Sequence, residues 1–155
     1  MAGRFDVVVT TALPPRQAWD AVTAWPAHGR HVPLTSVRVT KDAGGLGDEF
    51  VGRTGFSVLG FDDPMRVTGW VPPEGGSPGR CDVTKQGRVV TGWARIEVDE
   101  AGGRTRVRWV EEVGMGPAWL GRVVGPVVRV AGGLAFRRVL RRLLADAERG
   151  RHRAP

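Results

Sequence analysis

The sequence predicts an α+β fold in which a strongly bent antiparallel sheet of about seven strands wraps on a long C-terminal helix. A strand pattern opens the chain and is followed by a proline-marked helical segment. Six alternating segments then occupy residues 35–113, and a long amphipathic segment closes the chain. Alternation of apolar and polar residues indicates half-buried strands, whereas apolar spacings of three and four residues indicate helices.

The first strand and the helical segment after it lie within residues 4–33. RFDVVVTTA alternates, with Phe5, Val7 and Val9 on one face. The double proline of LPPRQAWDAVTAW ends the strand and presets the first turn of a helix. PAHGRHVP then leaves room for one further turn, so we expect one or two short helices. The apolar face of the first helix consists of Ala18, Trp19, Val22 and Trp25.

Glycine and proline turns separate the six later strands, which favours one meandering antiparallel sheet. The segments are TSVRVTKD, GLGDEFVGRTG, PMRVTGWVPP, RCDVTKQG, RVVTGWARIEVDE and RTRVRWVEEV. An antiparallel sheet can keep one face wet and one dry, and the alternating Arg and Glu positions fit the wet face. Asp62 and Asp63 precede Pro64. We therefore predict that they form a turn that starts a strand, not a pair of catalytic carboxylates.

The clearest helix is LAFRRVLRRLLADAERG, which should lay its apolar face on the sheet. That face consists of Phe136, Val139, Leu140, Leu143, Leu144 and Ala147. Arginines 137, 138, 141, 142 and 149 lie on the other face. PAWLGRVVGPVVRV precedes it, with a kink or break at Pro126. Gly150 is expected at the C-cap of this helix. We expect a single domain over residues 1–150, followed by a flexible basic tail over residues 151–155.

The net charge of +7 is concentrated at the C-terminus. Residues 134–155 hold seven Arg against one Asp and one Glu, so the rest of the chain is close to neutral. No aromatic residue interleaves with these arginines to stack bases, so we expect no nucleic-acid binding. No clean apolar run of about 20 residues exists, so we expect no stable membrane insertion. With no signal-peptide pattern, a cytoplasmic protein is expected, as a monomer or homodimer.

No cofactor or metal is predicted. Cys81 is the only cysteine, and His28, His31 and His152 show no ligand spacing with it. GGLGDEF lacks the lysine and the following helix of a phosphate loop. No Ser, Cys or Asp stands at a spacing that indicates a nucleophile triad.

The order of elements resembles the START/Bet v 1-like superfamily (SRPBCC), whose bacterial members are often described as polyketide cyclase/dehydrase-like. LPPRQAWDAVTAW after the first strand, the GLGDEFVGRTG strand and TRVRWVEEV before a Gly/Pro-rich helix carry the resemblance. It covers nearly the whole chain and implies a helix-grip fold with a deep hydrophobic cavity under the C-terminal helix. Members bind lipids, sterols, polyketides or hormones, and some are cyclases or hydrolases.

Glu111 shares an otherwise apolar strand face with Trp109 and Val113. Burying a carboxylate unpaired is costly, so we expect a partner, with Arg53, His28 or His31 as candidates. Glu111 then either anchors a ligand or acts as a general acid. The alternative is a structural ion pair at the cavity rim, or a strand end that twists into solvent.

Three functions therefore stay open. The first is binding of a small hydrophobic or amphipathic ligand, lipid or polyketide-like. The second is turnover by an enzyme of the polyketide aromatase/cyclase or dehydratase type, and the third is docking of the C-terminal helix onto a partner or membrane. The candidate catalytic residues are Glu111, Arg53 and His31. The candidate ligand-binding residues are Phe50, Phe56, Trp70, Trp109, Glu111, Trp119, Leu120, Val123 and Val127. The glycine-rich segment 117–133 is where a pocket is expected to open.

Overall fold

The computed structural model describes residues 3–56, 59–116, 126 and 128–153. Its elements follow the predicted order of strand, short helices, six strands and long helix. They are β1 (Gly3–Thr11), α1 (Pro15–Val22), α2 (Trp25–Gly29), β2 (Thr35–Lys41), β3 (Glu49–Phe56), β4 (Leu59–Val71), β5 (Gly79–Gln86), β6 (Val90–Ala101), β7 (Arg104–Met115), the π-helix η1 (Val128–Gly132) and α4 (Gly133–Arg153).

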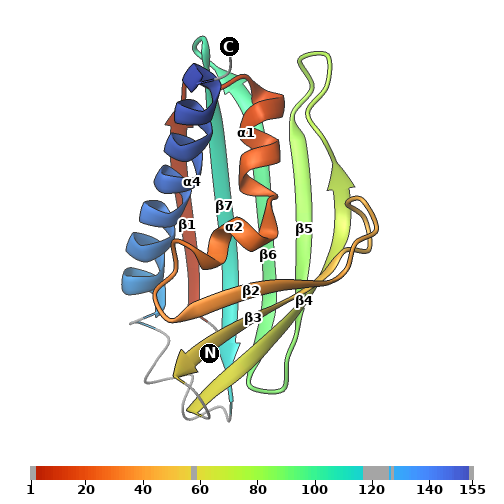
Figure 1. Cartoon of the computed structure of the whole chain (residues 1–155), viewed down its shortest axis with the longest axis vertical. Coiled ribbons are helices and arrows are strands. Elements are labelled where there is room, and N and C mark those ends of the chain that lie inside the picture. The colour runs from red at the N-terminus through yellow and green to blue at the C-terminus, as the bar shows by residue number, and fades with distance from the viewer. Residues whose placement is uncertain (1–2, 57–58, 117–125, 127, 154–155) are drawn as a thin grey trace.

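The strands form one seven-stranded antiparallel sheet in the order β1-β7-β6-β5-β4-β3-β2. The first strand returns beside the last, with Val7 opposite Trp109. Register shifts near Val39 and Val67 interrupt two ladders, and such irregularities bend a sheet. In Figure 1, β2, β3 and β4 cross the lower part of the view at a steep angle to β5, β6 and β7. The predicted bent antiparallel sheet is confirmed.

The long helix α4 packs its apolar face against the inner side of the sheet, next to β1 and α1 (Figure 1). Val139, Leu140, Leu143 and Leu144 are all buried. The arginines between them are exposed, as the amphipathic pattern requires. The predicted α+β, helix-grip arrangement is therefore confirmed. No helix among the described residues is long and apolar enough to cross a membrane.

Two local predictions are wrong. Asp62 and Asp63 form no turn: both lie within β4, opposite Arg53 and Gly52 of β3. The following Pro64 is tolerated there because pairing of β4 with β5 begins only at Met65, so its missing N–H breaks no rung on that side. At the other end, Gly150 is not a C-cap, because α4 continues through it to Arg153. Residues 154–155 lie outside the described residues.

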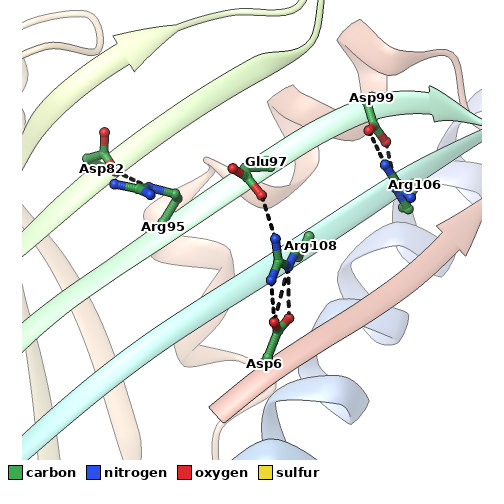
Figure 2. A network of polar contacts seen from close by, with 7 residues as sticks. All are labelled: Asp6, Asp82, Arg95, Glu97, Asp99, Arg106 and Arg108. Atoms are coloured by element: carbon green, nitrogen blue, oxygen red, sulfur yellow. Dashed lines mark hydrogen bonds and ion pairs between the residues drawn. The ribbon is translucent and has the colours of Figure 1, made fainter. Parts of the chain in front are cut away.

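The outer face of the sheet carries a run of ion pairs between neighbouring strands, which we call the outer charged ladder (Figure 2). Arg108 of β7 binds Asp6 of β1 and, at 3.4 Å, Glu97 of β6. The ladder consists of Asp6, Asp82, Arg95, Glu97, Asp99, Arg106 and Arg108. The hydrogen bond from Arg108 and the positive charge of its guanidinium lower the pKa of Asp6. Arg95, Arg106 and Arg108 are thus each matched by a carboxylate.

Candidate ligand-binding site

A cavity of about 290 Å³ lies between the inner face of the sheet, α2 and α4. Most of its surface is apolar. Its lining includes Trp25 and His28 of α2, Phe50 of β3, Val83 of β5, Trp109 of β7 and Phe136 of α4. The curvature of the sheet creates this space, because side chains from β2 to β7 face a common interior. Such a concave, mostly apolar site with a few polar groups is typical of small-molecule binding.

Aromatic rings form one wall of the cavity. Trp25 stacks on Phe50, with ring centroids 4.5 Å apart and planes 9° from parallel. Trp109 lies 5.4 Å from the His28 ring and 5.0 Å from Phe136. Aromatic pairs prefer particular stacked or tilted geometries and add to the stability that burial gives, which favours fixed ring orientations. This wall offers flat, rigid surfaces to an apolar or aromatic molecule.

Three ionisable side chains meet in the cavity wall, and we call Asp63, Lys85 and Glu111 the inner charged cluster. Lys85 Nζ lies 2.5 Å from Asp63 Oδ2 and 3.1 Å from Glu111 Oε1. The Lys85 and Glu111 side chains are only 7% and 6% exposed. Trp109 donates a hydrogen bond of 2.9 Å from Nε1 to Glu111 Oε2. Glu111 therefore has a partner for each of its oxygens.

The strand registers bring this cluster together. Lys85 of β5 and Glu111 of β7 lie on opposite sides of β6, so about 10 Å separates their strands. On β6, Gly92 stands opposite Lys85 and Ala94 stands opposite Glu111. The long lysine side chain crosses β6 at the point where that strand carries these two small residues. Gly92 also has φ +132°, and a Cβ there would approach Glu112 O to 1.9 Å.

Burial shifts the pKa values of these groups in different directions, depending on the charge of the ionised form. Burial raises the pKa of Asp63, and the nearby Lys85 charge offsets this only in part. Burial alone would lower the pKa of Lys85, but the Glu111 and Asp63 carboxylates outweigh it and raise that pKa. Lys85 is therefore a cation at neutral pH. The cluster is an ion pair with a second carboxylate attached.

Among the described lining residues, His28 is the remaining titratable group. Its Nε2 lies 2.8 Å from Val22 O. Because a carbonyl oxygen only accepts, Nε2 carries the proton and donates. Burial lowers the pKa of His28, which keeps the ring neutral at neutral pH. No group of three His, Cys, Asp or Glu residues suited to a metal ion occurs among the described residues.

The structure brings together some of the candidate site residues and separates others. Phe50, Trp109 and Glu111 line the cavity. Trp70 instead packs edge-on against Trp19, with centroids 4.9 Å apart, and is absent from the described lining. Trp119, Leu120, Val123, Val127 and the side chain of Phe56 lie outside the described residues.

The expected partners of Glu111 were misassigned. Arg53 is exposed and pairs with Asp62 at 2.9 Å, because its side chain leaves β3 on the face away from the cavity. His31 lies outside the described lining and pairs with Asp146 of α4 at 2.9 Å. His28 does line the cavity, but its hydrogen bond goes to the backbone. Lys85 is the residue that pairs with Glu111.

Lys85 and Asp63 are the site residues that sequence reasoning missed. The pattern of RCDVTKQG places Lys85 on the same strand face as Cys81 and Val83, which are both buried. A lysine on an apolar strand face is a signal comparable to Glu111 itself. Asp63 gave no such signal, because the Asp-Asp-Pro sequence is typical of turns.

Comparison with solved structures reveals the same fold in proteins of low sequence identity. A protein from Thermus thermophilus is 10% identical, with 95% of this chain and 98% of that chain covered and a TM-score of 0.75. The Zhui aromatase/cyclase from a Streptomyces species is 14% identical, with 99% and 98% covered and a TM-score of 0.70. Norcoclaurine synthase from Thalictrum flavum, solved with dopamine and hydroxybenzaldehyde, is 13% identical, with 94% and 88% covered and a TM-score of 0.59.

At these identities the solved structures establish the fold alone. No curated protein matched the sequence. The sequence profile described as polyketide cyclase/dehydrase and lipid transport matches residues 2–148, which is nearly the whole chain. The seven-stranded bent sheet closed by a long C-terminal helix agrees with that match. The chain therefore belongs to the polyketide cyclase/dehydrase and lipid transport family.

Proposed function

We propose that this protein binds a small hydrophobic or amphipathic molecule, lipid or polyketide-like, in the cavity between the sheet and α4. The observation that carries the proposal is the aromatic-walled cavity with the inner charged cluster in its side. Apolar burial supplies about 25 cal/mol per Å² of ligand surface, and a few polar groups fix orientation. At about 290 Å³ the described cavity suits a small ligand or one end of a longer one.

The family and the structural relatives support this proposal. The family description names both polyketide cyclisation and lipid transport, so an apolar ligand is common to its activities. One relative in the solved structures is an aromatase/cyclase, and another holds two small aromatic molecules. Each of these ligands or substrates would place a largely apolar body against rings such as Trp25 and Phe50.

Tryptophan fluorescence tests the binding proposal. A panel of flat aromatic and aliphatic molecules should change the emission of Trp25 and Trp109 and raise the melting temperature. Trp25→Phe should reduce the ligand-dependent change, because that ring lines the cavity. Trp70→Phe is the matched control, since Trp70 packs on Trp19 away from the lining, and it should leave the change intact. A diverse panel without any response in either readout would contradict the proposal.

The inner charged cluster favours a second candidate, an enzyme of the aromatase/cyclase or dehydratase type. In such a reaction a carboxylate removes a proton from the carbon beside a ligand carbonyl. The resulting enolate forms a carbon–carbon bond to a second carbonyl, and the proton returns to the new alkoxide. Asp63 suits the proton-accepting step, since its raised pKa lies nearer the working pH.

Turnover of a poly-β-carbonyl substrate separates the two candidates. Under the enzyme hypothesis, Asp63→Asn removes turnover while ligand binding stays measurable, because the amide keeps the shape of the side chain and loses the proton-accepting charge. Under binding alone, wild-type protein leaves the substrate unchanged compared with buffer. Equal product formation by wild-type and Asp63→Asn proteins would contradict a role for Asp63 in proton transfer.

A further inference from the structure

All but one of the polar side-chain atoms of the inner charged cluster have a partner among the described residues. An ammonium group has three donors, and Lys85 Nζ directs its contacts to Asp63 Oδ2, Glu111 Oε1 and, at 3.7 Å, Met65 Sδ. Glu111 accepts from Lys85 at one oxygen and from Trp109 at the other. Two of the three Lys85 N–H groups are therefore engaged by carboxylates, and the third meets only the weak acceptor Met65 Sδ.

One polar atom of the cluster is left over. Asp63 Oδ1 is buried and has no hydrogen-bond partner among the described residues. A buried acceptor without a donor is unfavourable by about 1–3 kcal/mol, and more when it is charged. Gly52 stands opposite Asp63 on β3 and also lines the cavity, so no side chain from that position fills the space beside the carboxylate.

The charge of the cluster points to the same ligand chemistry. Asp63 and Glu111 contribute two carboxylates against the single ammonium of Lys85. These are the charged groups that act on Asp63, and the neutral His28 adds no positive charge to the cavity wall. A ligand carboxylate would bring a third negative charge into a poorly solvated site, where it is repelled and loses its hydration.

We propose that the cavity selects ligands that present a hydrogen-bond donor, a hydroxyl or an ammonium group, to Asp63, and that it discriminates against carboxylates. The inference rests on the proposed binding function and names the ligand class. The terminal torsion of a carboxylate is broad, so a small rotation turns Oδ1 toward a donor in the cavity. Asp63 is then the residue that determines specificity, and Lys85 holds it in position.

A series of naphthalene derivatives tests the proposal, because only the polar group changes between its members. Affinities of 2-naphthol, 2-naphthylmethylamine, 2-methylnaphthalene and 2-naphthoate are measured near neutral pH by calorimetry and by tryptophan fluorescence. The alcohol and the amine should bind about tenfold or more tightly than the carboxylate, with the methyl compound between them. A carboxylate that binds as tightly as the alcohol would overturn the proposal.

Variants of the two neighbouring aspartates locate the effect. Asp63→Asn keeps the shape of the side chain and removes its charge, so it should reduce the disadvantage of naphthoate. Asp62→Asn is the matched control on the exposed side of β4, and it should keep the wild-type ranking. A ranking unchanged in a folded Asp63→Asn protein overturns the role of Asp63.

The failures of the two proposals are distinguishable. If neither the four compounds nor the wider panel of aromatic and aliphatic molecules bind, the binding function fails and this inference fails with it. If all four bind equally, the binding function stands and the inference is overturned. Should Asp63→Asn not fold, the wild-type ranking alone still decides between donor and carboxylate ligands.

Discussion

The inner charged cluster and the outer charged ladder use opposite faces of one sheet and differ in almost every physical respect. Strand β7 contributes to both: Glu111 lines the cavity, whereas Arg108 belongs to the outer charged ladder (Figure 2). The inner pair of Lys85 and Glu111 is 7% and 6% exposed, whereas Arg108 and Asp6 are 44% and 43% exposed. Alternation along the strands thus gives one sheet a buried lysine ion pair on its inner face and exposed arginine ion pairs on its outer face.

The contrast shows that contact geometry does not determine what an ion pair contributes. Exposed pairs gain little, about 0–1 kcal/mol, because water and salt screen them. A buried pair need not add net stability either, but removing one partner is severe since the other charge is left buried. The outer ladder therefore suits a surface, while the inner cluster fixes charge at a place where a ligand would meet it.

The largest effect is expected from Lys85→Met, which leaves Asp63 and Glu111 buried without their cation. We expect the free energy of unfolding to fall by about 3–5 kcal/mol at neutral pH. Lys41→Met is the matched control, since Lys41 is exposed, and it should change stability by less than about 0.5 kcal/mol. Urea denaturation measures both variants, and near-equal midpoints would show that the inner cluster is not energetically coupled.

The fold could be predicted from single-strand and single-helix patterns because burial acts on each element separately. Phe5, Val7 and Val9 on one side of β1, and Leu140 and Leu144 on one side of α4, face the core as their spacing requires. Prediction from the sequence fails where pairing with a neighbouring element determines the conformation of a segment. Asp62 and Asp63 lie in a strand because β3 pairs with them, and no local turn preference can report that pairing.

The site could be predicted only in part for the same reason. The inward direction of Glu111 follows from the alternation within β7. Its partner Lys85 lies on β5, and the contact depends on the sheet order, which places only β6 between β5 and β7. Sheet order is not a property of one strand, so the sequence left Arg53, His28 and His31 as candidate partners. Of these, Arg53 lies on the outward face of its strand and pairs with Asp62.

A smaller effect, of opposite sign for the two regions, is expected in the pH dependence of stability. The pKa of Asp63 is raised in the folded state, so the folded protein binds this proton before the unfolded chain does. The contribution of Asp63 to stability therefore increases as pH falls toward the unfolded-state pKa of about 3.9. The pKa of Asp6 is lowered by Arg108, so its stabilisation is present above that value and is lost as pH falls through the lowered pKa.

Asp63→Asn and Asp6→Asn should therefore show opposite trends when each is compared with wild type by urea denaturation between about pH 3 and 7. The free energy of unfolding of wild type minus that of Asp63→Asn should increase as pH falls. The free energy of unfolding of wild type minus that of Asp6→Asn should decrease toward low pH. Parallel trends in the two variants would mean that burial does not distinguish the two carboxylates.

The smallest effect is expected from Arg108→Gln in the outer charged ladder. Arg108 binds Asp6 and Glu97, yet about half of its side chain is exposed, so its loss should matter little in ordinary buffer. Salt makes the comparison sharper: the Debye length falls to about 3 Å at 1 M, which screens the outer pairs and hardly reaches buried ones. The already small effect of Arg108→Gln should fade between low and high salt, while the effect of Lys85→Met should persist. If both effects respond equally to salt, solvent ions reach the inner cluster, and the electrostatic basis for excluding carboxylate ligands from the cavity is removed.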